Sequence, residues 1–262
     1  MTRSAPVPLW DRWDDLAPRL ATGTLLAAFD YDGSLVPIRP TPDEAIADPA
    51  TREAVARLAS TPGTTVAIVS GRPVSQLRDL LDADALWLVG LHGLELVAPR
   101  GEILQTIDLE AAAAALAPLR SQAAAIAARH PATRIEDKGA SLVLHTRQAS
   151  RPTAAAAIAE LRATAGSLSG FELLAGKETL EVRPAGVSKG TAMLRVRRDA
   201  GGSTALYVGD DITDEDAFAA LAGDGAVTIR VGDEGPTCAS HMLRTQEEVA
   251  ELLARLLALR SS

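Results

Sequence analysis

The stretch that decides the fold is LLAAFDYDGSL, residues 25–35. An apolar run of this length that stops at acidic residues and glycine predicts a buried parallel strand whose carboxyl end opens into a loop. Open α/β sheets bind their ligands at this edge. We therefore expect the rest of the chain to be organised around the end of this strand.

Asp30 and Asp32 lie two residues apart at the end of the run. In an extended segment such residues point to the same side, so both carboxylates can face one pocket. Neighbouring carboxylates repel each other unless a cation or a shared proton lies between them. The pair predicts metal binding or acid–base chemistry, although an Asp-Gly turn would be the simpler interpretation of the pair alone.

Composition limits the classes of function. The chain has 262 residues, 47% of them hydrophobic, which suffices for one large domain or two smaller ones. Its net charge of -8 implies no overall attraction to nucleic acid or to an anionic membrane. The single Cys238 cannot form an internal disulfide and is interpreted as structural. With neither a signal peptide nor a spanning apolar run in the sequence, a cytoplasmic protein is expected.

Strand-like and helix-like segments alternate before residue 105. Apolar strands are predicted at residues 64–69 and 85–89, and helices are predicted after Asp48-Pro49 and from Pro73. This spacing suits parallel crossover connections. The first part of the chain therefore predicts one half of a doubly wound sheet.

The middle of the chain has a different order, helix, two strands, helix, two strands. It predicts antiparallel hairpins covered by helices on one side, with one apolar and one charged sheet face. The first helix is expected to be interrupted at Pro118. The predicted segments are residues 108–129, 134–138, 141–147, about 152–165, 171–174 and 179–183.

The first pattern then resumes. Ser188-Lys189-Gly190 precedes a helix, and a strand at residues 205–208 ends in Gly209-Asp210-Asp211. The expected fold class is therefore α/β, a doubly wound parallel sheet with an inserted smaller α/β cap domain. The core would comprise residues 1–105 and 185–262, and the cap residues 106–184.

Four predicted core strands end in polar groups beside glycines, and such ends meet at one edge of a parallel sheet. Carboxylates gathered there suit Mg²⁺, while a lysine, a hydroxyl and backbone amides suit a phosphoryl group. This combination predicts phosphoryl transfer, in which Asp30 attacks phosphorus and Asp32 exchanges protons. The converging residues are Asp30, Asp32, Ser70, His92, Gly93, Lys189, Asp210 and Asp211.

Four ordered motifs, DYDGS, SGR, SKG and GDDITDED, resemble those of the haloacid dehalogenase-like phosphatases. The resemblance implies an aspartyl-phosphate on Asp30, acid–base catalysis by Asp32, and phosphoryl binding by Ser70 and Lys189. It implies a metal set of Asp30, Asp32, Asp210 and Asp211, with Asp214 as a weaker candidate that supports the ligands.

A finer resemblance lies in GLHGLE, IEDKGASLVLHTR and LEVRPAGVSKG, which are similar to trehalose-6-phosphate phosphatases. The sugar-binding acidic-x-Lys pair and Glu of that family match Glu136, Lys138 and Glu181, whereas Thr146 replaces a frequent aromatic residue. The resemblance implies Mg²⁺-dependent hydrolysis of trehalose 6-phosphate. The alternatives are a sucrose-phosphate or mannosyl-3-phosphoglycerate phosphatase and a non-catalytic sugar-phosphate sensor.

Further polar residues are candidates for substrate binding, although a solvated sheet face or a surface ion pair would also explain them. The expected partner is a small sugar phosphate, with no nucleic acid or membrane, for a monomer that is functionally linked to a trehalose-6-phosphate synthase. The candidates are Gly71, Arg72, His92 and Gly93 in the core and His145, Arg147 and Arg183 in the insert.

Overall fold

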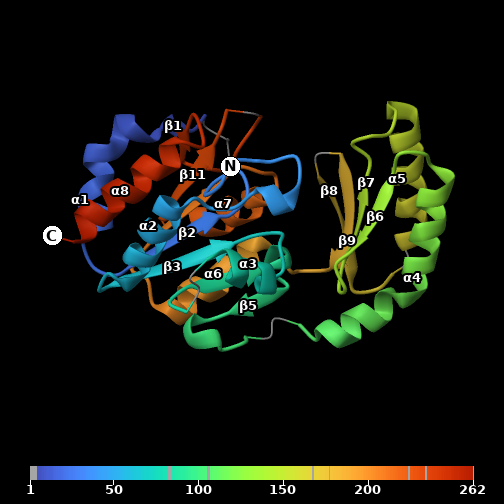
Figure 1. Cartoon of the computed structure of the whole chain (residues 1–262), viewed down its shortest axis with the longest axis horizontal. Coiled ribbons are helices and arrows are strands. Elements are labelled where there is room, and N and C mark those ends of the chain that lie inside the picture. The colour runs from blue at the N-terminus through green and yellow to red at the C-terminus, as the bar shows by residue number, and fades with distance from the viewer. Residues whose placement is uncertain are drawn as a thin grey trace. The chain divides into compact units, whose positions relative to one another are not determined.

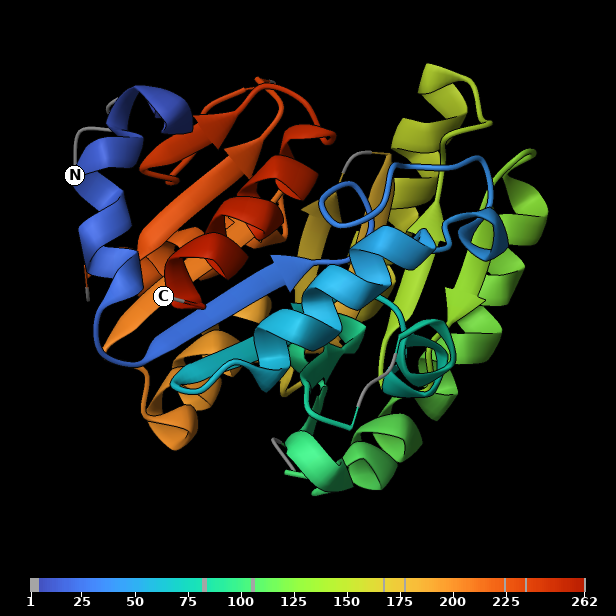
Figure 2. The same cartoon turned by 60° about the vertical axis from the view of Figure 1, so that its left-hand side comes forward.

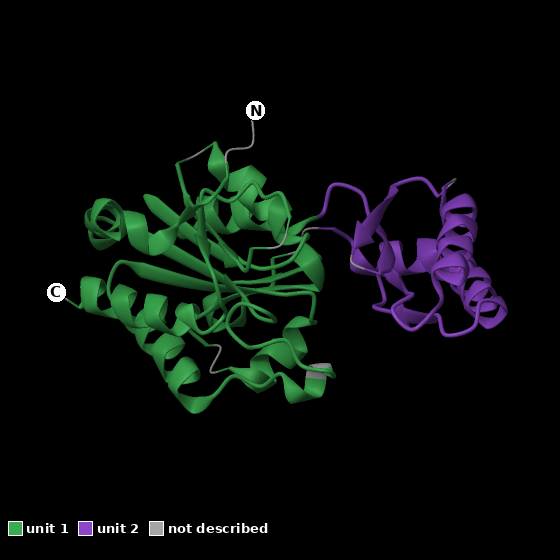
Figure 3. Ribbon diagram, turned by 90° about the horizontal axis from the view of Figure 1, so that it is seen from above, with its two compact units in different colours: residues 1–106, 188–262 green, residues 107–187 purple. Residues whose placement is uncertain are grey.

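The computed structural model describes residues 5–81, 84–104, 107–166, 168–176, 178–223, 225–233 and 235–261. The chain forms two compact units, residues 1–106 with 188–262 and residues 107–187 (Figure 3). The first predicted boundary, between residues 105 and 106, lies outside the described residues. The second, after residue 184, falls shortly before the end of the inserted unit at residue 187.

A mainly parallel sheet forms the centre of the larger unit (Figures 1 and 2). Its order within the described residues is β1-β12-β11-β10-β2-β3-β4-β5, in which β4–β5 is antiparallel and the other pairs are parallel. The expected doubly wound fold class is confirmed. The strands are β1 (Val7–Pro8), β2 (Leu25–Asp30), β3 (Thr64–Val69), β4 (Trp87–Gly90), β5 (Glu95–Val97), β10 (Thr204–Gly209), β11 (Val227–Val231) and β12 (His241–Leu243).

The strand order reverses at β2. From this strand the chain moves through β3 to β4 on one side, and it returns through β10, β11 and β12 on the other. Asp30 is paired in register with Val69 of β3, and Phe29 with Val208 of β10. Ligands of open α/β sheets bind at such a reversal, so the carboxyl ends of β2 and β10 are where a site is expected.

Helices cover both faces of this sheet. Leu25, Ala27 and Phe29 of β2 face one hydrophobic core, while Leu26 and Ala28 face the other. A strand buried on both faces explains the uninterrupted apolar run in the sequence. The first core contains residues of α1 (Trp13–Ala21), α2 (Pro49–Ser60), α3 (Val74–Leu80) and α8 (Glu248–Arg260), and the second contains residues of α6 (Lys189–Ala200) and α7 (Asp214–Ala222).

The helix ends follow the residues that predicted them. Asp48 accepts hydrogen bonds from the backbone N–H groups of Ala50 and Thr51 at the start of α2. Ser188 forms a capping box with Thr191 at the start of α6, and Gly201 ends that helix with φ of 69°. Lys189, the first residue of α6, is thereby held at a defined helix end.

The smaller unit is an antiparallel sheet, whose described strands have the order β6-β7-β9-β8, with two helices on one face (Figures 1 and 3). Leu142, Leu144, Leu180 and Val182 face these helices in one core. The predicted hairpins and the predicted apolar face are confirmed. The elements are α4 (Leu109–Arg129), β6 (Arg134–Asp137), β7 (Leu142–His145), α5 (Arg151–Ala165), β8 (Phe171–Gly176) and β9 (Thr179–Pro184).

The predicted interruption at Pro118 is wrong, because α4 continues through this residue. Proline removes one backbone donor from a helix, and tertiary packing can outweigh that loss. Leu116 and Leu119 on either side of it are buried in the core of the smaller unit. Nη1 of Arg120 also donates a 2.6 Å hydrogen bond to the carbonyl of Ala113, one turn before the proline.

No helix in the described part of the chain combines the length and the apolar character that crossing a bilayer requires.

Candidate active site

Three carboxylates lie together where β2 and β10 end. Asp30 is the last residue of β2, Asp210 follows β10, and Asp214 is the first residue of α7. One oxygen of each lies within 4.8 Å of the others. Nζ of Lys189 donates hydrogen bonds to Asp30 Oδ1 at 2.6 Å and to Asp214 Oδ1 at 2.8 Å. The structure therefore brings together Asp30, Lys189 and Asp210, which are far apart in the sequence.

This group carries an excess of negative charge, because three carboxylates face one ammonium. Burial raises the pKa of Asp30 well above its ordinary value; Lys189 opposes this shift, while Asp214 and Asp210 add to it. Burial likewise raises the pKa of Asp210 to about 7, with a contribution from Asp214. Burial by itself lowers the pKa of Lys189, but the Asp214 and Asp30 carboxylates outweigh it and raise this pKa. A further cation would relieve the repulsion.

Asp214 organises the loop that carries Asp210. Its Oδ2 accepts hydrogen bonds from the backbone N–H groups of Asp210 at 3.1 Å and Asp211 at 2.9 Å. Its Oδ1 accepts from Lys189 and, at 2.7 Å, from the buried hydroxyl of Tyr207. A carboxylate offers about four lone-pair positions, and these four donors occupy them. Asp214 thus fixes the positions of the other members of the group. The sequence had indicated it only as a weaker candidate that supports the metal ligands.

The remaining oxygens fit a divalent cation. Asp210 Oδ1 is buried and has no hydrogen-bond partner within the described residues. Because Asp214 is saturated, Asp30 and Asp210 are the carboxylates that would hold the ion, and carboxylate oxygens are what Mg²⁺ prefers. The metal set expected from the sequence also contains Asp32 and Asp211, and that larger set stays a prediction. Asp32 is bound to Arg72, and the side chain of Asp211 is exposed.

Arg72 joins the loops after β2 and β3. Its Nε and Nη2 donate to Asp32 Oδ2 and Oδ1 at 2.7 and 2.6 Å. Its backbone N–H donates to Ser70 Oγ at 3.0 Å. Asp30, at the end of β2, is paired with Val69, at the end of β3. Asp32 and Ser70 therefore both lie just beyond the ends of two neighbouring strands. The bidentate pair between Arg72 and Asp32 was not predicted, because the sequence indicated either positive charge near a phosphate or a pair with an unspecified surface acid.

Gly33 allows the loop after β2 to approach the loop after β10. Its φ is +88°, and a Cβ atom at this position would lie 2.2 Å from Asp210 Oδ2. Such a distance is impossible for a real side chain, and the conformation itself favours glycine. The DYDGS motif therefore requires its glycine for contact with the acidic group.

The loops after β3 and β4 also lie against each other. A Cβ atom on Gly71 would be 2.5 Å from Nε2 of His92, and one on Gly93 would be 2.5 Å from the carbonyl oxygen of Ser188. His92 itself has a left-handed φ of 56°. The candidates Gly71, His92 and Gly93 therefore lie in loops that pack closely against each other. Gly93 also packs against Ser188, the residue before Lys189.

The charged face of the smaller unit has its own network. Val143 is paired in register with Glu136 on one side and with Glu181 on the other, so both carboxylates lie on the same face as this valine. Ser141 Oγ donates to Glu181 Oε1 at 2.8 Å, and His145 Nε2 lies 2.7 Å from Glu136 Oε2. The hydrogen bond with His145 lowers the pKa of Glu136, although burial opposes it.

The other candidates of this unit have separate positions. Lys138 closes the turn between β6 and β7, where its N–H donates to the carbonyl of Ser141 at 3.0 Å. Arg183 is buried, and its Nε donates to Glu172 Oε1 at 2.7 Å. Arg147 is exposed and pairs with Glu178 at 3.1 Å. Strand alternation alone could have paired Arg183 with the face of Glu181, but not with Glu172, because that contact depends on the register of β8.

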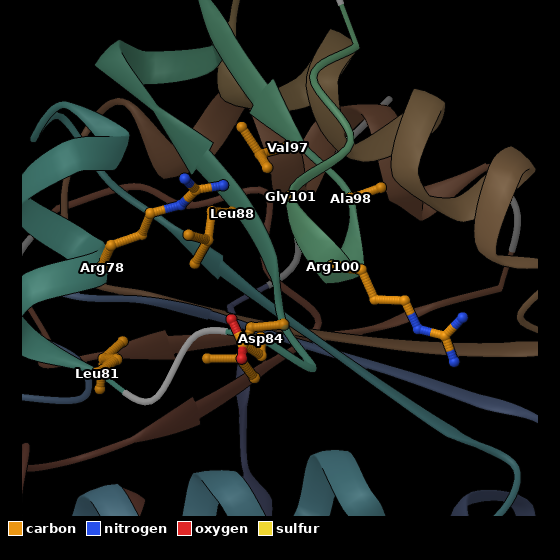
Figure 4. Close-up of a pocket in the computed structure, with 9 residues that line it drawn as sticks. Arg78, Leu81, Asp84, Leu88, Val97, Ala98, Arg100 and Gly101 are labelled. Atoms are coloured by element: carbon orange, nitrogen blue, oxygen red, sulfur yellow. The ribbon is translucent and has the colours of Figure 1, made fainter.

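A cavity of about 320 Å³ lies at the amino end of β4 (Figure 4). Arg78 extends over Leu88 there, while the guanidinium of Arg100 points away from Arg78. The cavity contains none of the candidate catalytic residues and lies at the edge where β4 begins, whereas those residues follow strand ends. It does not belong to the acidic centre.

Comparison with known proteins identifies the family. The trehalose-phosphatase family model matches residues 28–245. A trehalose-phosphate phosphatase of Mycobacterium marinum is 35% identical over 240 residues, which are 87% of this chain and 60% of that protein. A bifunctional trehalose-6-phosphate synthase/phosphatase of Thermoproteus tenax is 36% identical over 238 residues, 88% of this chain and 32% of that protein. The chain thus spans at most about three fifths of these relatives.

The structural similarity covers the chain more fully. A trehalose-6-phosphate phosphatase of Aspergillus fumigatus has a TM-score of 0.74 and 27% identity, over 99% of this chain and 100% of that one. The resemblance that the motifs indicated is confirmed, and the chain belongs to the trehalose-phosphatase family.

Proposed function

We propose that this chain hydrolyses trehalose 6-phosphate to trehalose and phosphate, with Mg²⁺ and through an aspartyl-phosphate. The observation that carries the proposal is the convergence of Asp30, Lys189 and Asp210 at the reversal of the strand order. A carboxylate in contact with an ammonium and beside an unpartnered acidic oxygen suits phosphoryl transfer. The names of the relatives from M. marinum and A. fumigatus favour this substrate.

The first half of the reaction transfers the phosphoryl group to the protein. A carboxylate oxygen of Asp30 attacks phosphorus, the bond from phosphorus to the sugar oxygen breaks, and Asp32 gives that oxygen its proton. The ammonium of Lys189 offsets charge on the phosphoryl oxygens, to which the Ser70 hydroxyl can donate a hydrogen bond. A bound Mg²⁺, held by Asp30 and Asp210, would supply further positive charge.

The second half releases phosphate. Asp32 takes a proton from water, the water oxygen bonds to phosphorus, and the bond from phosphorus to Asp30 breaks. Asp30 returns to its starting form. Asp32 serves as acid and then as base, so its orientation matters in both halves.

The smaller unit would select the sugar, in the role of a cap domain. Glu136, Lys138 and Glu181 would hold the hydroxyls of the disaccharide by charge-assisted hydrogen bonds. Support comes from the common face of Glu136 and Glu181 and from the hydrogen bond that fixes Glu181 to Ser141. The fused T. tenax relative favours a functional link to a trehalose-6-phosphate synthase.

The test is a phosphate-release assay over a panel of sugar phosphates. We expect the purified chain to act on trehalose 6-phosphate in preference to sucrose phosphate and mannosyl-3-phosphoglycerate. Activity should require Mg²⁺ and disappear with a chelator, because the acidic group keeps its charge excess without a cation. Preference for another sugar phosphate would replace the substrate assignment. Tight binding without phosphate release would instead favour a sensor.

A second prediction concerns substrate choice. Glu181→Ala should lower kcat/KM for trehalose 6-phosphate by about 10²-fold, since a charge-assisted contact to the sugar is lost, but lower that for p-nitrophenyl phosphate by no more than about threefold. The matched control is Glu160→Ala, which removes a carboxylate from α5, one of the two helices packed on the opposite face of the same sheet. Equal losses on both substrates would contradict a sugar-binding role for Glu181.

A further inference from the structure

Arg72 is held more firmly than the aspartate to which it binds. Its side chain is 9% exposed, whereas that of Asp32 is 39% exposed. The backbone of Arg72 is fixed at two points, because its N–H donates to Ser70 Oγ and its carbonyl accepts from the N–H of Leu91 at 2.9 Å. The backbone of Arg72 is therefore anchored to the loops after β3 and β4, and Asp32 is the more accessible member of the pair.

The ring of Tyr31 provides a second anchor. The guanidinium carbon of Arg72 lies 5.1 Å from the centre of this fully buried ring, within the range of a cation–π contact. The hydroxyl of Tyr31 accepts from the N–H of Ala47 at 3.2 Å and donates to the carbonyl of Ala45 at 3.3 Å. The guanidinium is thus in contact with a fixed aromatic ring as well as with the aspartate.

The two donors of the Arg72 guanidinium, Nε and Nη2, then set the orientation of the Asp32 carboxylate. Two parallel N–H···O contacts at 2.7 and 2.6 Å fix both oxygens of a carboxylate, which a single contact would leave free to rotate. An ion pair in which one member is more than a third exposed contributes little to stability. The main consequence of this ion pair is therefore that it orients the Asp32 carboxylate.

We propose that Arg72 is a positioning residue for the proton transfers of Asp32, and not a ligand of the substrate phosphate. The inference rests on the proposed function, in which Asp32 protonates the leaving sugar oxygen. Lys189 is a cation that is hydrogen-bonded to Asp30, the proposed nucleophile. The two N–H groups that Arg72 donates to Asp32, on Nε and Nη2, are not available to a phosphate while this contact is formed.

The two roles have different kinetic consequences. A sugar alkoxide is a poor leaving group and needs the proton of Asp32, whereas p-nitrophenolate leaves without one. A residue that positions the acid therefore affects the transfer of the phosphoryl group from the sugar ester and spares the transfer from the aryl ester. A residue that binds phosphate affects both, because both esters carry the same group.

The experiment compares Arg72→Met and Arg72→Lys with the wild-type chain in Mg²⁺, under single-turnover conditions. We expect the transfer from trehalose 6-phosphate to slow by about 10²-fold, and the burst of p-nitrophenolate from p-nitrophenyl phosphate to slow by no more than about threefold. KM for the sugar phosphate should change little. The control is Arg78→Met, an exposed arginine on α3. Circular dichroism would show that the variants are folded, and Arg72→Lys keeps the charge if Arg72→Met does not fold.

A double substitution tests whether Arg72 acts through Asp32. Arg72→Met combined with Asp32→Asn should slow the sugar-phosphate reaction by no more than about twofold beyond Asp32→Asn alone. Parallel losses on both esters, a large rise in KM, or additive effects would overturn the positioning role while leaving the phosphatase function intact. A wild-type chain that releases phosphate from neither ester would remove the proposed function, and this role with it.

Discussion

Asp30→Asn should reduce the turnover of trehalose 6-phosphate by a factor on the order of 10⁵, as the loss of a covalent nucleophile does in other enzymes. An amide cannot attack phosphorus, and Asn has nearly the same size as Asp. The fold should persist, because the substitution also removes one of three mutually repelling carboxylates. Steady-state phosphate release and the melting temperature measure the two effects.

The control for this variant is Asp199→Asn, which changes a carboxylate of α6 that pairs with Arg195 and Arg198 instead of with the acidic group. We expect it to keep full activity. Asp30→Asn with ordinary turnover would remove the nucleophile assignment. Loss of the folded state in Asp30→Asn would leave its inactivity unexplained by chemistry, and the melting curve separates these cases.

Lys189→Met should destabilise the protein by about 3–5 kcal/mol as well as abolish activity. The side chain of Lys189 is 2% exposed, and its partners Asp30 and Asp214 are 6% and 0% exposed. Removing the ammonium leaves these buried carboxylates without their cation, so they must stay charged and repel each other or take up protons. Urea unfolding with and without the substitution gives the difference in unfolding free energy.

The explanation can be separated from a simple packing defect. Adding Asp30→Asn to Lys189→Met should recover part of the lost stability, because one of the uncompensated charges disappears. A defect of packing would not be repaired by a nearly isosteric change at Asp30. A Lys189→Met protein as stable as the wild type would contradict the buried charge network.

Much of the candidate site could be predicted because it depends on strand ends. The apolar run before Asp30 fixes its place on β2, and the same reasoning places Ser70 after β3 and Asp210 after β10. Parallel pairing then brings these ends to one edge without further information. Lys189 could be added because a helix start after Ser188 is visible in the sequence.

The partners within the site could not be predicted in the same way. Asp214 becomes the centre of the group through loop hydrogen bonds to the N–H groups of Asp210 and Asp211, and the acidic motif contains several other acids that could have taken that part. The pairing of Arg72 with Asp32 depends on the direction of a long side chain, which sequence spacing does not determine. Such contacts arise from tertiary geometry.

The edges of the larger sheet were also missed. β1, β5 and β12 contain only two or three residues each, too few for an alternating pattern to be visible. β5 turns back beside β4 as an antiparallel strand within a region that otherwise predicts parallel crossovers. The centre of the sheet was predictable because its strands are long and buried on both faces.

Gly33 lies in a position that leaves no room for a larger residue beside the acidic group. A single methyl group at this position would have to occupy the space of the Asp210 carboxylate. Alanine or proline can stabilise other turns by restricting the unfolded chain, but at residue 33 either one should strain the backbone and displace the Asp210 carboxylate. The position of the Asp210 carboxylate beside the loop after β2 thus depends on the absence of a Cβ atom at residue 33.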